Sequence, residues 1–551
     1  MDYLKRIETR EAELDELRKR QDADKDLLYL KKYLMKDIEN KTVADIIHVT
    51  LNRPAVLAAN VIAALGKVVE QRVVESQSKS LDTEYIEQFI RAGFRGANAL
   101  LRKKGKPEIN PFFDEQTCIR GGGSALCAFQ MIGGVLVPNI VPWDFRYVTW
   151  EEGQDGYACY STTRKKSELL VEYPEFKDRG INSLMVVRDV WDKTHNEIWI
   201  GNQMVVEQEH PYGYVPVSLQ MVPLGSMLTD SDAVSHQGES IFFLIRTIIP
   251  ELNRLASIMQ TLNLKAVKPP MKAKKRGAGD APAYEEVSGM SAITTMEPDE
   301  DIQTIDYGDA KRAAEMALNM FSQAEAEGSL PPEAFGSIDI SLSNVALITL
   351  GERAGQVFFP RLKTKALLNQ SLAEMFIQQC LQIGGTLELG TAGHKRSFNT
   401  EKLKGEYEVA FEYFPKSPSL DMARFSVAAT GKTVGMTQRA IDIEILQRED
   451  PEGDERQRRW EMAEALVPAV RLQRIVKSLI EDAERGDDDA ELEAELVSAA
   501  MGVTLQQMLS GAEGQTPEVE PPLKPNPLQL GPGNQAETAV KQNAARQLSP
   551  V

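Results

Sequence analysis

One segment, Asp230 to Glu327, limits the possible folds of this chain more than any other. The apolar residues of its first arm recur at alternating spacings of four and three, the pattern of a helix packed lengthwise against other helices. They are Ile241, Ile245, Ile248, Leu252, Leu255, Met259 and Leu262. We predict a single helix from Ala233 to Leu264, about 48 Å long. Pro250 has no N–H to donate, so we expect a bend there.

A second arm, Ala310 to Ala326, returns with smaller side chains, which allow helices to approach one another closely. Its apolar stripe consists of Ala313, Ala317, Met320 and Ala324, with Ala314, Leu318 and Phe321 beside it. Two long arms joined at a tip cannot bury both of their flanks within one hairpin. The pattern therefore indicates that the arms need neighbouring elements. The alternative is a pair of ordinary core helices in a large α-rich domain.

The tip between the arms, Lys265 to Asp309, changes charge along its length. Its start is basic, and two prolines favour an extended path there. The basic residues are Lys265, Lys268, Lys272, Lys274, Lys275 and Arg276. Its end, from Glu297 onward, is acidic, but no catalytic frame supports an Mg²⁺ site there. Opposite charges in one module can pair head to tail between copies around a ring, and a solvated linker is the alternative.

The middle of the chain predicts a mixed protein of class α+β. Pro107 to Val222 consists of short β-branched and aromatic runs separated by turns, which indicates a mostly antiparallel β-rich domain. Thr386 to Phe414 has the same character and is expected to rejoin that domain. Asn344 to Ile383 has a long helical pattern, with a kink expected where two glycines and Pro360 interrupt it.

The two ends of the chain are poorer in large apolar residues. Residues 1 to 39 predict one or two helices with a thin apolar stripe, which is expected either to pack on a partner subunit or to be solvated. Lys41 to Lys106 predicts three helical segments, around Val43–Leu51, Pro54–Val74 and Thr83–Arg102. Thr437 to Leu509 is helical again. From Ser510 onward Pro, Gln, Gly and Asn dominate, which is typical of a disordered tail.

The charge balance restricts how this chain can meet nucleic acid. It has 63 basic and 81 acidic residues, a formal net charge of −18. Proteins that grip DNA by its phosphates are usually basic, because their affinity comes from counterion release. The composition therefore argues against a sequence-specific DNA binder, although not against a conduit. No apolar run is long enough to span a membrane, and the charged start has no secretory h-region.

No pattern of catalytic or metal-binding residues outweighs an ordinary structural interpretation. Gly431-Lys432-Thr433 resembles the end of a phosphate loop, but the glycine required five positions earlier is Ser426. Gly121 to Ser124 lacks the GxSxG frame of a hydrolase. The five histidines lie far apart, and the four cysteines have no CxxC spacing, so we expect buried thiols in a reducing compartment. We predict no enzyme activity, no catalytic residue, no metal and no cofactor.

The order of these features resembles that of bacteriophage portal proteins, the head-to-tail connectors, in the form found in short-tailed phages. Two stretches of the β-rich region carry the likeness: Val141-Pro142-Trp143-Asp144-Phe145-Arg146 followed by Trp150-Glu151, and His210 to Val217. The long helix, then Ala266 to Pro270 entering the tip, the returning helix, a broken apolar loop and a very long kinked helix complete it. The resemblance covers about residues 40 to 510.

The resemblance implies a mainly helical, ring-forming portal fold with a β-rich wing, a two-helix stem, a small α/β clip and a helical crown. Its divisions are an N-terminal charged helix (1–40), the wing (41–229), the first stem helix (230–264), the clip (265–309), the second stem helix (310–327), the tunnel loop (328–343), a long kinked helix with wing strands (344–436), the crown (437–510) and a disordered tail (511–551). The residues expected at the DNA channel are Pro332, Phe335, Ile338, Asp339 and Ile340.

The function that the resemblance implies is a channel at one vertex of a capsid. A ring, most often of about twelve copies, would let double-stranded DNA enter during packaging and leave during ejection. The implied partners are other copies of the chain, double-stranded DNA, the terminase motor, major capsid and scaffolding proteins, and tail adaptor proteins, with no membrane. The implied location is the virion, and the host cytoplasm during assembly. The alternatives are a structural tail or scaffold component without a DNA channel, and an ATP-dependent packaging enzyme.

Overall fold

The structure is a computed structural model of the chain. It describes residues 3–76, 78, 81–132, 135–177, 183–225, 228, 230, 232–267, 271–274, 301–304, 310–329, 344–391, 393–414, 418–446 and 448, and isolated positions between 454 and 497. The chain divides into two units, Met1–Gly453 and Asp454–Val551. The helices and strands with defined bounds all lie in the first unit. Most of the predicted crown and the whole of the predicted tail lie outside the described residues.

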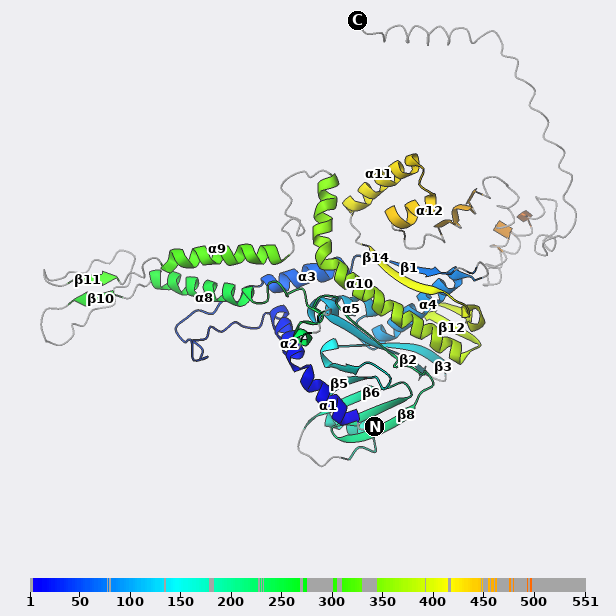
Figure 1. The fold of residues 1–551 in the computed structure, drawn as a ribbon, viewed down its shortest axis with the longest axis horizontal. Coiled ribbons are helices and arrows are strands. Elements are labelled where there is room, and N and C mark those ends of the chain that lie inside the picture. Colours follow the sequence, from blue (N-terminus) through cyan, green and yellow to red (C-terminus); the bar gives the residue numbers. More distant parts are fainter. Residues whose placement is uncertain are drawn as a thin grey trace, which may run out of the picture. The chain divides into compact units, whose positions relative to one another are not determined.

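Two antiparallel sheets occupy the region predicted to be β-rich (Figure 1). The first has the order β3-β2-β9, and the second follows the chain from β4 to β8. The strands are β2 (Gly122–Ile132), β3 (Val135–Trp143), β4 (Val148–Glu151), β5 (Tyr157–Lys165), β6 (Leu184–Trp191), β7 (His195–Ile200), β8 (Gln203–Glu209) and β9 (Val217–Met221). A short 3-10 turn, η1 (Phe145–Tyr147), and a helix, α6 (Lys166–Glu172), interrupt them. The predicted antiparallel β-rich region is confirmed.

The later strands do not rejoin these sheets, which corrects the expectation for Thr386 to Phe414. Strand β14 (Glu408–Phe414) pairs with β1 (Val69–Glu75), and β12 (Thr386–Thr391) pairs with β13 (His394–Asn399). The prediction of a helix from Pro54 to Val74 is therefore wrong in its last third. The helix ends at Leu65, and the β-branched run that follows pairs across the chain, a partner that local periodicity does not reveal.

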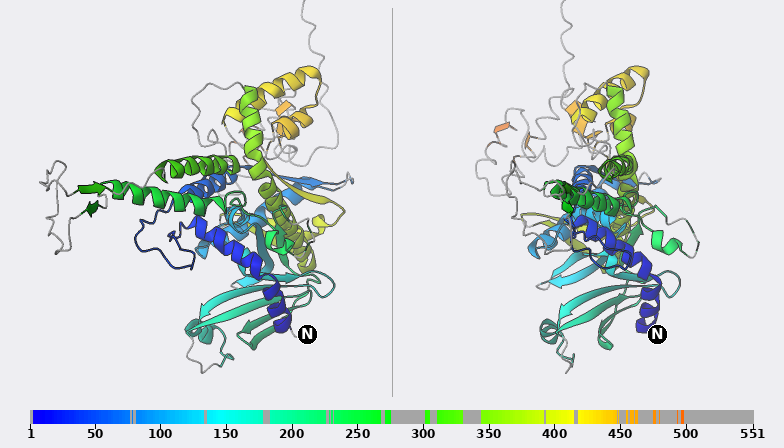
Figure 2. Two further views of the ribbon diagram at one scale, coloured as in Figure 1. Left: turned by 60° about the vertical axis from the view of Figure 1, so that its left-hand side comes forward. Right: turned by 90° about the vertical axis from the view of Figure 1, so that its left-hand side faces the viewer.

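Four helices share one apolar core with these strands. They are α3 (Arg53–Leu65), α4 (Thr83–Lys103), α5 (Ile109–Ile119) and α10 (Asn344–Ile383). The Phe89 and Phe376 rings stack with their centroids 5.1 Å apart. A Cβ at Gly93 would lie 2.3 Å from Phe376, so α4 and α10 approach this closely only because residue 93 is glycine. Helix α10 changes direction along its length and contains Pro360, in accord with the predicted kink (Figures 1 and 2).

The N-terminal helices α1 (Tyr3–Glu13) and α2 (Asp15–Leu28) pack on the same chain. Ile7, Leu14 and Leu17 are fully buried against the five-stranded sheet and its neighbours. Buried ion pairs hold α2 in place, with Asp24 accepting from Arg246 Nε at 2.7 Å. For α1 and α2, neither expectation, a partner subunit or solvent, is therefore correct. Its thin stripe is stable because the sheet supplies the missing apolar surface.

The predicted single helix from Ala233 to Leu264 is wrong in its first half. The structure has a short helix, α7 (Ala233–His236), a break, a series of turns and then α8 (Ile248–Val267). Gly238 makes the break, because its φ of +64° belongs to the left-handed region that glycine favours. The expected bend at Pro250 is also wrong. Pro250 lies in the first turn of α8, where a missing N–H costs nothing.

The remaining elements complete the first unit. They are β10 (Met271–Lys274), β11 (Asp301–Thr304), α9 (Ala310–Gly328), η3 (Thr400–Leu403), α11 (Pro418–Val434), α12 (Gln438–Ala440) and η4 (Ile441–Ile445). Helices and strands are both abundant and largely segregated along the chain, so the predicted class α+β is confirmed.

Candidate functional site

Helices α8 and α9 form an antiparallel hairpin, with β10 and β11 paired between them (Figure 1). On α8, Leu252 and Leu255 are buried, and Ile248, Met259 and Leu262 are half-buried. These residues belong to the predicted packing stripe and form one side of the helix. The other two members of the stripe, Ile241 and Ile245, precede α8 and are buried in the main core instead.

The face that α9 turns inward differs from the predicted one. Ala314 is buried, and Leu318 and Phe321 are half-buried and pack on the main core cluster. Of the predicted stripe, Ala317 is half-buried, whereas Ala313 and Met320 are exposed. The inward face is therefore the row that lies beside the predicted stripe.

The base of the hairpin is tied to α3 by charge. Arg53 forms an ion pair with Glu325, whose side chain is only 11% exposed, and also donates to Ser322 Oγ at 3.4 Å. Arg53 begins α3, so this contact joins segments that are 272 residues apart. An ion pair with one half-buried partner fixes orientation more than it adds stability.

An extended segment lies along α8 on the side away from its apolar residues. The backbone N–H groups of Ile47, Val49 and Leu51 donate to Thr261 Oγ1, Ser257 Oγ and Asn253 Oδ1 at 3.0, 2.9 and 2.9 Å. Two residues of extended chain advance about 6.6 Å, and four residues of helix about 6.0 Å. The two repeats therefore match, and every second N–H meets every fourth helix side chain. We call residues 29–52 the arm.

The arm corrects two predictions, because helices were expected to continue to residue 39 and to cover Val43–Leu51, whereas residues 29–52 contain no helix. A signal for it exists, since Asn253, Ser257 and Thr261 form a polar row, spaced four residues apart, on the side of the helix opposite its apolar row. All three side chains are buried, and buried polar groups are almost always hydrogen-bonded. The row therefore indicates that a polar partner lies along α8, although not which segment supplies it.

The tip of the hairpin is described only at its two strands. Lys272 and Lys274 lie on β10, opposite Gln303 and Asp301 of β11 in the antiparallel register. The other basic residues expected to act at the tip, Lys268, Lys275 and Arg276, lie outside the described residues. So do the residues expected at the DNA channel, which are Pro332, Phe335, Ile338, Asp339 and Ile340.

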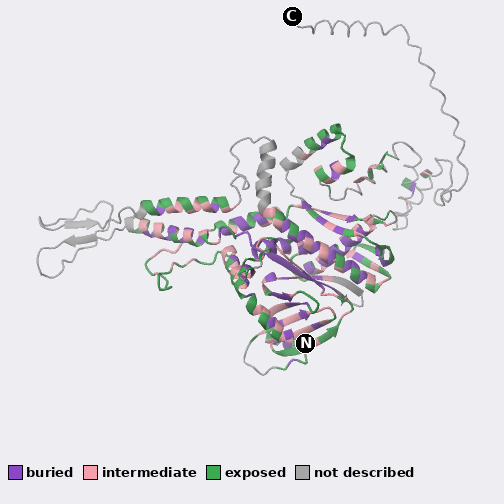
Figure 3. Ribbon diagram, viewed as in Figure 1, coloured by how far each residue is buried: buried purple, intermediate pink, exposed green. Residues whose placement is uncertain are grey.

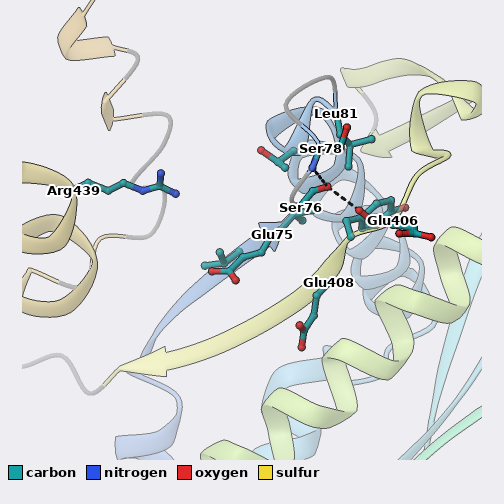
Figure 4. A pocket seen from close by; sticks show the side chains of 11 residues that line it. Glu75, Ser76, Ser78, Leu81, Glu406, Glu408 and Arg439 are labelled. Atoms are coloured by element: carbon teal, nitrogen blue, oxygen red, sulfur yellow. Dashed lines mark hydrogen bonds between the residues drawn. The ribbon is translucent and has the colours of Figure 1, made fainter.

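A cavity of about 980 Å³ opens where β1 ends and β14 begins (Figure 4). Glu75 and Glu408 are opposite each other in the register, and Ser76 Oγ donates to the Glu406 carbonyl at 2.8 Å. Arg439 lies across the cavity from these residues (Figure 4). The described lining contains no histidine or cysteine.

Two further groups of polar residues have structural explanations. Lys365 Nζ donates to both oxygens of Asp114 at 2.8 and 2.9 Å, in a core where each side chain is 3% exposed. Burial raises the pKa of Asp114, and Lys365 opposes that shift. The four cysteines are all buried and unpaired with one another. Burial raises the pKa of Cys118, Cys127 and Cys159 to about 12, so these thiols are unreactive.

Lys432 lies in the last turn of α11 rather than in a loop that precedes a helix. A phosphate loop needs the opposite order, because the backbone N–H groups at a helix start bind the phosphate. Among the described residues, no three His, Cys, Asp or Glu side chains gather as metal ligands. No described helix combines the length and apolar character needed to cross a membrane.

No family model matches the chain, and no curated protein matches it. Among solved structures, one chain in the neck of an empty gene transfer agent particle covers 70% of this chain and 87% of its own length, with 11% identity and a TM-score of 0.39. A chain in the virion of a native gene transfer agent particle covers 70% and 86%, with 12% identity and a TM-score of 0.36. At such scores the likeness carries no argument about fold or function.

Proposed function

We propose that this chain is a portal-type subunit, of which about twelve copies form a ring around a channel for double-stranded DNA at one vertex of a capsid. The observation that carries the proposal is the α8–α9 hairpin. The two helices bury their apolar faces on each other and on the core, yet the outer side of α9 exposes Met316 and Met320 by 77% and 61% (Figure 3). Exposed apolar rows on long helices favour packing between copies of a chain.

The sequence resemblance supports the same function. The two stretches that carry it, Val141 to Glu151 and His210 to Val217, flank strands β5 to β8 in the sequence. The α8–α9 hairpin comes next in the sequence, at the position expected for the stem. The two-stranded sheet of β10 and β11 lies between its helices in the sequence, at the position expected for the clip. Helix α10 then follows as the long kinked helix.

The overall charge suits a conduit. About twelve copies, each with a net charge of −18, carry roughly −200 in total. Such a ring repels the phosphates of DNA on average, so that the duplex slides rather than adheres. The basic residues of the tip, with Lys272 and Lys274 on β10, then act as local guides or docking points.

In this proposal the subunit resides in the virion and assembles in the host cytoplasm. Its partners are other copies of itself, the packaging motor, capsid and scaffolding proteins, and tail adaptors, and its part is structural rather than enzymatic. The competing function is a structural head or tail component with no DNA channel. An ATP-using enzyme is disfavoured because Lys432 ends a helix instead of preceding one.

Mass photometry of the purified chain over a range of concentrations tests the proposal. A single closed species of about twelve chains is the expected result, because a heterologous contact that closes on itself stops at a fixed number of copies. Monomers at every concentration would contradict it. A ring whose lumen is narrower than duplex DNA would instead favour the structural component without a channel.

A further inference from the structure

The arm is ordered without being buried. None of the residues from Tyr29 to Asn52 is buried in the single chain. Hydrogen bonds nevertheless fix their path, since the N–H groups of Tyr33 and Met35 donate to Thr50 Oγ1 and His48 Nδ1 at 2.9 and 3.1 Å. An isolated bridge between Lys36 and Thr42 closes its end. A segment with so little burial is usually disordered, because only burial offsets the entropy lost on ordering.

The arm presents large apolar side chains to solvent. Tyr29 is 70% exposed, Leu34 43% and Ile38 106%, the last of them at the turn that ends the arm. Asn40 has a φ of +68°, a conformation that asparagine tolerates better than most residues and that reverses the chain there. The arm therefore holds an apolar tip in a defined place while giving it nothing to pack against in its own chain.

The arm and the methionines of α9 lie on opposite flanks of the hairpin. On α8, the row Asn253, Ser257 and Thr261 faces the arm, and the apolar row of Leu255, Met259 and Leu262 lies roughly 150° around the helix. On α9, Met316 and Met320 likewise lie roughly 150° from Ala314, Leu318 and Phe321. Figures 1 and 2 show the same order, with the residues that join α2 and α3 on one side of α8 and α9 on the other.

Two exposed apolar surfaces on opposite flanks of one hairpin are the requirement for a heterologous contact that repeats around a ring. We propose that the arm of one copy packs its Ile38 tip against the Met316 and Met320 face of α9 in the next copy. The occupant of both surfaces is thus a second copy of this chain. This inference rests on the proposed ring and names a contact that seals it.

The charges near the two surfaces do not oppose the contact. Within the described residues, Lys31 and Lys41 pair with Asp26 and Glu39 of the same chain. The arm also exposes Lys32 and Lys36 together with Asp37 and Asp45, and α9 exposes Glu315 and Glu327 together with Arg312, so neither surface carries a large charge of one sign. Methionine also suits such a contact, because its flexible thioether fits an irregular partner surface.

The test is cross-linking between two variants of the full chain, each of which carries one added cysteine. One preparation carries Ile38→Cys and the other Met316→Cys, with affinity tags of different size, and the two are mixed and assembled together. The natural cysteines stay silent because all four are buried. Mild oxidation is expected to give a disulfide-linked heterodimer, visible on non-reducing gels, as the main product. The matched control pairs Met316→Cys with Val171→Cys, whose site is 83% exposed but lies on α6, and is expected to give less than a tenth of that product.

A second variant, Met316→Lys with Met320→Lys, is expected to raise the concentration needed for half-assembly at least tenfold, with an unchanged circular-dichroism spectrum. Normal ring assembly of this lysine variant, together with a mixture of Ile38→Cys and Met316→Cys chains that gives no more cross-link than the Val171 control, would overturn the arm contact and leave the ring standing. Monomers in the unmodified protein would overturn both the contact and the proposed function.

Discussion

The hydrogen bonds between the arm and α8 allow one prediction to be worked out in detail. Ser257→Ala and Thr261→Val together remove two of the three acceptors that bind the arm, those of Val49 and Ile47. Each lost bond costs about 0.5–1.5 kcal/mol, so the pair costs roughly 1–3 kcal/mol. The arm contributes no buried side chain, so this loss opens the arm locally and leaves global unfolding nearly unchanged.

Hydrogen exchange measured by mass spectrometry reports this opening directly. A loss of about 1–3 kcal/mol accelerates exchange of the arm amides by roughly 5- to 150-fold, and the midpoint of urea unfolding stays the same. Thr433→Val is the matched control, because Thr433 Oγ1 donates to the carbonyl four residues earlier at 3.0 Å, as Thr261 does at 2.7 Å, but on α11. Unchanged exchange at Ile47 and Val49 in the double variant would refute the view that these side chains hold the arm.

Three further predictions concern the core and the tip. Burial raises the pKa of Asp189 to about 6, so the protonated side chain stabilises the fold fully below about pH 4 and this contribution is lost as the pH rises to 6. Across that range the free energy of unfolding of Asp189→Asn, measured with urea, should rise by roughly 1–3 kcal/mol relative to that of the natural protein. A difference that stays constant with pH would contradict the assignment. Lys365→Met leaves the buried Asp114 carboxylate without its partner and should lower the free energy of unfolding by about 3–5 kcal/mol. Adding Asp114→Leu to the same chain should restore most of that loss. Equal losses in the single and the double variant would show that the pair is not coupled. Lys272→Glu with Lys274→Glu should weaken ring closure or tail docking, as seen by mass photometry and co-sedimentation with tail components, whereas unchanged assembly and docking would make these lysines a solvated surface.

The β-rich region was predictable because its information is local. Alternating β-branched and aromatic residues specify strands from two-residue periodicity alone, and short turns specify antiparallel neighbours. The five-stranded sheet follows the chain in order, so that each strand pairs with the next one along the sequence. Strand β1 shows the limit of this reasoning. Its partner, β14, lies more than three hundred residues later, and a helical pattern just before it extended the predicted helix too far.

The hairpin was partly predictable for a similar reason. The apolar spacing of α8 and α9 is periodic and was found, but the start of α8 depends on Gly238, which approaches Gly121 so closely that a Cβ there would lie 2.3 Å from the Gly121 carbonyl. That contact joins residues far apart in the sequence, and the apolar spacing continues past Gly238, so local periodicity does not reveal the break. The docking of α2 likewise depends on Asp24 and Arg246, which are 222 residues apart. The predicted roles of the tip and of the channel residues remain predictions.

Electron microscopy of the assembled chain, averaged by class along the particle axis, tests the central claim most directly. The account predicts closed rings of about twelve copies, with the α8–α9 hairpins side by side around a lumen that admits duplex DNA. A self-sufficient monomer, with the hairpin folded against its own body and no annular assembly at any concentration, would contradict it.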